Sequence, residues 1–173
     1  MAAYLGAAPS ISNKAYLAVA GSILVVESQH ETWLKSAVDS QDGFPRAFAA
    51  GLDFSEVYSL AAPFIKSCPK SNPALPFTAF PGLTATIEGT PKPGAKVNFK
   101  AAKQVGAKYA AFVSATSTQF MDISGSEGTI TLPDGIRGQS YLLLTKTKSI
   151  ADEAVAAGPA LLNVPLPNRN FSY

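Results

Sequence analysis

Two side chains of the sequence are spaced so that they could bind a metal ion together. Glu27 and His30 stand three residues apart in a largely apolar stretch, and in a helix this spacing places both on one face. Carboxylate-bridged di-metal centres use such a Glu-x-x-His pair twice, together with two further glutamates. His30 is the only histidine of the chain. We therefore expect Glu27 and His30 to be ligands of at most half an iron or manganese site, which this chain cannot complete alone.

A structural role for the same two residues stays open. An unpartnered carboxylate among apolar side chains costs several kcal/mol, so Glu27 needs a cation, a metal ion or a proton beside it. His30 or groups of neighbouring helices could supply that partner in a hydrogen-bond network. Glu31 and Lys35, four residues apart, are predicted to form an ion pair on a solvated helix face.

Other chemistry finds little support in the sequence. No Gly-x-Ser-x-Gly nucleophile motif, glycine-rich phosphate loop or zinc-type cysteine spacing is present, so a non-enzymatic role is favoured. Asp122, Glu127 and Asp134 could bind calcium, but turn carboxylates are more often solvated. The net charge is +2, from 14 basic and 12 acidic residues without a basic run, and this argues against a nucleic-acid partner.

Helices are expected to position Glu27 and His30. Residues 13–40 contain no proline and a single glycine, and Ser12 or Asn13 can cap a helix there. Apolar residues occupy nearly all sides of its first half, which predicts burial by other helices. Residues 2–8 are predicted to be the last turns of a preceding helix.

A second complete helix is expected to begin at Asp53 or Ser55, with Pro63 shortening or kinking it. Two antiparallel helices cannot enclose their own apolar surface. We therefore expect residues 1–67 to be the closing part of a helical bundle whose other helices are supplied upstream or by self-association. Only 15% of residues are charged, which agrees with a partly covered surface.

A change of pattern after residue 67 predicts a second domain. Residues 68–82 are rich in proline and predict an extended linker. Short alternating segments with turn residues between them then predict a small, antiparallel, Ig-like β-sandwich over residues 83–173. The expected strands are residues 83–90, 95–101, 108–114, 119–124, 129–132 and 140–147, with a possible edge strand at 161–166. The expected fold class is thus α+β, and no apolar stretch is long enough to span a membrane.

The sequence also resembles a known family. The similarity to the ferritin-like domain of fungal stress-response and desiccation-related proteins is carried by Ala3-Tyr-Leu-Gly-Ala-Ala8, Gly21-Ser-Ile-Leu-Val-Val-Glu-Ser-Gln-His30 and Leu60-Ala-Ala-Pro-Phe-Ile65. Leu132-Pro-Asp-Gly135, Gly138-Gln-Ser-Tyr141 and Ala157-Gly-Pro-Ala160 are similar to the β-rich tail of the same group.

The resemblance implies that a signal peptide and two further helices precede this segment, and that Glu27 and His30 hold a metal-ligand-like position. Cys68, the only cysteine, would then pair with a cysteine outside the segment. The implied role is secreted and stress-associated, in the extracellular space or cell wall, where the Asn170 sequon could be glycosylated. The alternatives are a di-metal oxidase and a module that binds cell-wall carbohydrate through Tyr109, Phe112, Phe120 and Tyr141.

Overall fold

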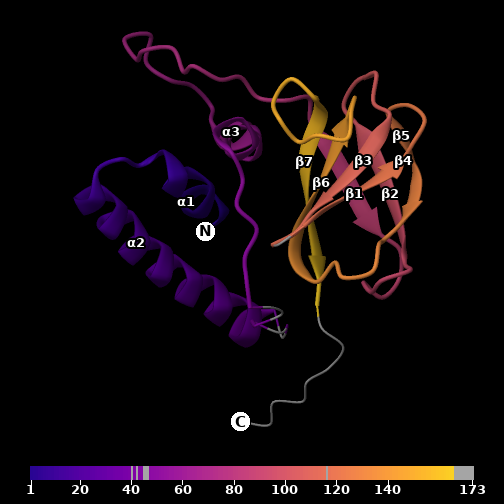
Figure 1. The fold of residues 1–173 in the computed structure, drawn as a ribbon, viewed down its shortest axis with the longest axis horizontal. Helices are drawn as coiled ribbons and strands as arrows, with labels where there is room; N and C mark the ends of the chain where they lie inside the picture. Colours follow the sequence, from indigo (N-terminus) through magenta and orange to yellow (C-terminus); the bar gives the residue numbers. More distant parts are fainter. Residues whose placement is uncertain (40, 42, 45–46, 116, 166–173) are drawn as a thin grey trace.

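The protein is described by a computed structural model, which covers residues 1–39, 41, 43–44, 47–115 and 117–165. In this part of the chain, three α-helices precede seven β-strands that form two antiparallel sheets. The predicted α+β class is confirmed. Figure 1 shows the helices beside one face of the sheets, with α1 and α3 nearer the strands and α2 farther out.

Helix α1, Ala2–Ala7, and helix α2, Lys14–Trp33, begin the fold. Pro9 lies in a 3₁₀ turn, Ala8–Ser10, that ends α1 as the sequence predicts. Asn13 caps α2, because its side-chain oxygen accepts the backbone N–H groups of Ala15 at 2.9 Å and Tyr16 at 3.3 Å. The residues that the sequence indicates therefore end α1 and begin α2.

The end of α2 differs from the prediction. After Trp33 the backbone continues as a π-helical turn, Leu34–Val38, rather than as α-helix to residue 40, which lies outside the described residues. No residue of α2 is buried, and the helices predicted to bury it were expected upstream of this segment or from another copy of the chain. Within the described residues, α1 is the helix that packs against α2.

Helix α3, Phe54–Ala61, joins the helical region to the sheets. Asp53 accepts the N–H of Glu56, and the Glu56 side chain accepts the N–H of Asp53, so the pair forms a reciprocal capping box. Pro63 lies in the 3₁₀ turn Ala62–Phe64 and ends the helix, as predicted. Residues 68–82 contain no helix or strand, and the predicted division into domains stays a prediction.

The strands form two sheets in the orders β1-β2-β5 and β4-β3-β6-β7. Their bounds are Leu83–Ile87 for β1, Lys96–Ala101 for β2, Tyr109–Val113 for β3, Thr118–Asp122 for β4, Glu127–Thr131 for β5, Gly138–Thr145 for β6 and Val155–Val164 for β7. Each of the first six overlaps a predicted segment, with ends that differ by up to three residues. Strand β7 is an edge strand, as expected, but it begins at Val155 instead of residue 161.

Two apolar clusters hold the molecule together. The larger lies between the sheets, where Val97 and Phe99 of β2 meet Phe112 of β3 and Leu142 of β6. The smaller lies on the opposite face of the second sheet, where Ala50 and Leu52 of the helical region are buried against residues of β3, β6 and β7: Ala111, Val113, Tyr141, Leu143 and Val155. The helical region therefore covers this sheet and shares a core with it.

None of the described helices combines the length and the apolar character that crossing a lipid bilayer requires.

Two of the aromatic residues considered for sugar stacking, Phe112 of β3 and Tyr141 of β6, are buried in the apolar clusters at 0% and 3% exposure. The sandwich therefore does not present these two rings to a ligand.

Candidate functional site

Glu27 is positioned by α2 at the edge of the helical region. Its carboxylate forms an ion pair with the amino group of Met1, with 3.2 Å between oxygen and nitrogen. The side chain of Glu27 is 42% exposed. A cation thus satisfies this acid, and no hydrogen bond joins it to His30 among the described residues.

His30 lies one turn further along α2, and it is exposed to solvent. Within the described part of the chain, no group of three histidine, cysteine, aspartate or glutamate residues is arranged to hold a metal ion. Glu27 and His30 therefore do not by themselves fit an iron or manganese centre. The metal site stays a prediction that depends on ligands from other helices.

A continuous apolar surface, which we call the outer stripe, runs along the exposed side of α2. Its members alternate at spacings of three and four residues, so they line one face of the helix. They are Tyr16, Val19, Ile23, Val26, His30 and Trp33. The five apolar members are between 39% and 69% exposed. This stripe has the apolar pattern of a helix-packing surface, and it has no covering element in the described residues.

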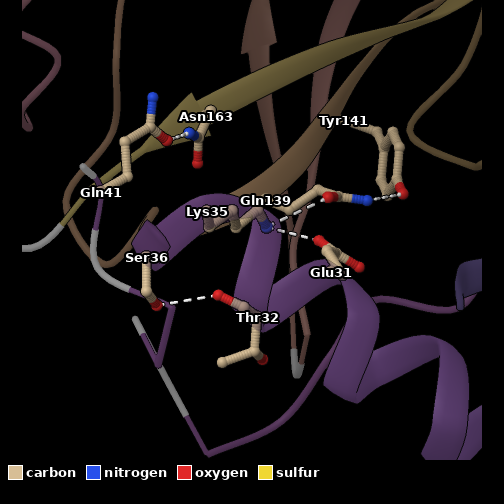
Figure 2. Close-up of polar contacts among 8 residues, drawn as sticks. All are labelled: Glu31, Thr32, Lys35, Ser36, Gln41, Gln139, Tyr141 and Asn163. Carbon is tan, nitrogen blue, oxygen red and sulfur yellow. Dashed lines mark hydrogen bonds and ion pairs between the residues drawn. The ribbon is translucent and has the colours of Figure 1, made fainter. Parts of the chain in front are cut away.

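The carboxyl-terminal turn of α2 makes polar contacts with the second sheet (Figure 2). Lys35 pairs with Glu31, and its ammonium group also donates to the Gln139 side chain of β6 at 3.4 Å. The Gln139 amide in turn donates to the Tyr141 hydroxyl at 2.6 Å. The side chains of Lys35 and Glu31 are 18% and 25% exposed. The prediction of a solvated Glu31–Lys35 pair is therefore wrong, because this pair is held between the helix and the sheet.

A second contact reinforces the same junction. Asn163 of β7 donates a side-chain hydrogen bond to Gln41, which follows the helix (Figure 2). The Ser36 hydroxyl donates to the backbone oxygen of Thr32 at 2.8 Å, within the π-helical turn region. A cavity of about 230 Å³ remains at this junction, lined by Lys35, Gln139 and Tyr141 among others. Lys35, Gln139 and Tyr141 are linked by hydrogen bonds at its wall, so the arrangement joins the helical region to the second sheet.

A cluster of carboxylates surrounds the start of α3. Asp53 and Glu56 form the capping box, and the Ser55 hydroxyl donates to Asp152 of the β6–β7 connection at 2.5 Å. Burial is the main cause that raises the pKa of Glu56 to about 7, and the charges of Asp53 and Asp152 add to it. Burial also raises the pKa of Asp53. No cation is among the groups that set either value.

Sequence reasoning missed the role of Glu56. The pattern Asp53-Phe-Ser-Glu56 is a capping-box signature, and it could have indicated that Glu56 folds back on the helix start. Its burial could not have been read from the pattern, because Asp152 lies 97 residues from Ser55.

The remaining predicted residues lie apart from these contacts. Cys68 is exposed and forms no disulfide with another described residue. Glu127 forms an exposed ion pair with Lys100 at 2.8 Å, instead of joining Asp122 and Asp134. Asn170 lies outside the described residues.

Comparison with known proteins agrees with the helical arrangement. A family model described as a ferritin-like domain matches residues 1–40. This range contains α1, α2 and the residues of the outer stripe. None of the curated proteins compared with this chain matches it. The chain therefore begins with a ferritin-like region, which the helices α1 and α2 form.

Proposed function

We propose that this chain is a non-enzymatic contact protein in which the ferritin-like helices associate with further helices through the outer stripe. The observation that carries the proposal is the exposure of Val19, Ile23 and Val26 along one face of α2. Burying the part of one such side chain that is still exposed, about half of it, stabilises an association by about 1 kcal/mol. Several of them together favour a packed helix pair over a solvated stripe.

The charges around the stripe agree with helix packing. Between Lys14 and Lys35 the only acidic residues are Glu27 and Glu31, and the only further basic residue is His30 of the stripe itself. Both acids are engaged in ion pairs, with Met1 and Lys35. A second helix could therefore approach the stripe without burying an unpaired carboxylate. The occupant that fits is an amphipathic helix with a matching apolar face, as in a four-helix bundle.

We place this role outside the cell, in tolerance of stress or drying, with the sandwich as the contact module. The resemblance of the sequence to fungal desiccation-related proteins supports this setting, and the ferritin-like match at residues 1–40 agrees with the helical part of that resemblance. The buried link between helices and sheet supports a mechanical role, because Ala50 and Leu52 anchor the helical region on the sandwich. An assembly formed through α2 would thus carry the sandwich with it.

The size of the protein in solution tests the assembly. We expect light scattering at about 100 µM to give a mass well above the 18.0 kDa of one chain. Val19→Glu combined with Val26→Glu places charges on the stripe and should return the mass to that of one chain. Gln29→Glu adds a charge on a polar part of α2, and it should leave the assembly intact.

A monomeric wild-type chain with a stable, protected α2 would overturn this proposal. So would an assembly that the double variant leaves unchanged, because its interface would then lie elsewhere.

A further inference from the structure

The start of α3 contains a buried acid with an unpartnered oxygen. Glu56 is 2% exposed. Its Oε2 atom accepts the N–H of Asp53 at 3.0 Å, whereas its Oε1 atom has no hydrogen-bond partner among the described residues and is shielded from solvent. An ionised carboxylate in this position is costly, and a protonated one is much less so.

The groups that face Glu56 provide no compensating positive charge. Asp53 lies on the same turn of α3, and Asp152 approaches from the β6–β7 connection. Helix α1, which packs against α3, contributes Tyr4 as its only titratable side chain, and β7 contributes none. Every charged group identified near Glu56 is therefore acidic.

Helix α3 is also one of the elements that tie the helical region to the sandwich. Ser55 donates to Asp152, and the Ser59 hydroxyl accepts the N–H of Phe80 at 2.8 Å. Val57 and Leu60 pack against the smaller apolar cluster. Any change in the stability of the α3 start is transmitted to this attachment.

We propose that α3 is a pH-sensitive latch, which holds the helical region on the sandwich when Glu56 is protonated and loosens it when Glu56 is ionised. This inference does not depend on the proposed helical assembly, since the latch lies on a different element from the outer stripe. It predicts a pH-dependent attachment within a single chain.

The direction of the pH effect follows from proton linkage. The folded pKa of Glu56 is about 7 against an ordinary value of 4.5, so the closed state binds the proton more tightly than the open state. Attachment is strongest below pH 4.5, weakens as the pH rises to about 7, and then stays constant. The raised pKa of Asp53 acts in the same direction.

Amide hydrogen exchange of α3 tests the latch. After correction for intrinsic rates, we expect the protection of α3 in wild type to fall by a factor on the order of 10 to 100 between pH 5 and pH 8. Glu56→Gln keeps the capping geometry without the titrating proton, so its protection should depend on pH much less than that of wild type, with only the contribution of Asp53 remaining. Glu127→Gln, on an exposed carboxylate, should behave like wild type.

Amides of the sandwich serve as an internal reference for overall folding. Should Glu56→Gln fail to fold, Asp152→Asn removes one of the repelling charges and should show a smaller pH-dependent loss than wild type. The latch is overturned if α3 of wild type is equally protected at both pH values. It is also overturned if Glu56→Gln loses protection as wild type does.

Discussion

At the scale of single residues, Gly6 decides how closely α1 approaches the segment before α3. A Cβ atom at this position would lie 1.8 Å from the backbone oxygen of Leu52. Leu52 is buried, and its N–H donates to the backbone oxygen of Ala2 at 3.2 Å. The backbone of Gly6 lies against the backbone of Leu52, so no flexible side chain can move aside for a larger residue.

Gly6→Ala should therefore destabilise the protein by about 3 kcal/mol, in the upper range for overpacking. The matched control is Gly21→Ala in α2, where a Cβ atom would meet nothing within 4 Å. That substitution should stabilise the helix by about 0.5–1 kcal/mol, because glycine is a poor helix former. Urea unfolding of both variants measures the difference, and equal midpoints would contradict the close α1 contact.

Several residue-scale features could be predicted because they depend on neighbours in sequence. Asn13 caps α2, and Pro9 and Pro63 end the helices before them. The burial of Glu56 depends on a loop far along the chain, so local patterns do not reveal it. For the same reason, the sequence indicated a partner for Glu27 but not that it would be Met1.

At the scale of elements, the Lys35 contact joins a helix to a strand 104 residues away. Lys35 lies in the π-helical turn that follows α2, and its side chain reaches Gln139 of β6 from there. Lys35→Met removes the ammonium group, so the half-buried side chains of Glu31 and Gln139 lose their bonds to Lys35.

We expect Lys35→Met to lower the free energy of unfolding by about 1–2 kcal/mol, the cost of removing a partner from half-buried polar groups. Lys100→Met breaks an ion pair on the exposed face of the sandwich, and it should cause no measurable change. Thermal and urea unfolding compare the two variants. If Lys35→Met were as stable as Lys100→Met, the helix–sheet contact would contribute nothing to stability.

The strands could be predicted where their pattern alternates. Strand β2 has alternating exposed and buried residues, and it matches its predicted segment closely. The first half of β7 is Val155-Ala-Ala-Gly-Pro-Ala160, in which small residues, glycine and proline give little strand signal. Pairing with β6 makes this segment a strand, and that pairing is a tertiary contact.

At the scale of the whole molecule, the sheets and the helical region share a core, while the outer stripe of α2 remains uncovered. The sequence predicted the apolar sides of α2 correctly, and it assigned their covering to helices that residues 1–67 do not supply. Whether an apolar face is covered depends on elements that pack on it, and these are not encoded in the pattern of the helix itself. The role of the helical region therefore depends on what the outer stripe binds.

Trp33 reports directly on whether another helix packs on the outer stripe, because it is the only tryptophan and it lies on this stripe. In the single chain its side chain is 63% exposed. As the protein concentration rises, we predict that Trp33 emission shifts to the blue and that acrylamide quenches it less, both reversing in the Val19→Glu and Val26→Glu double variant. Emission that stays solvent-exposed at every concentration, while the chain remains folded, would contradict the proposed role of the stripe.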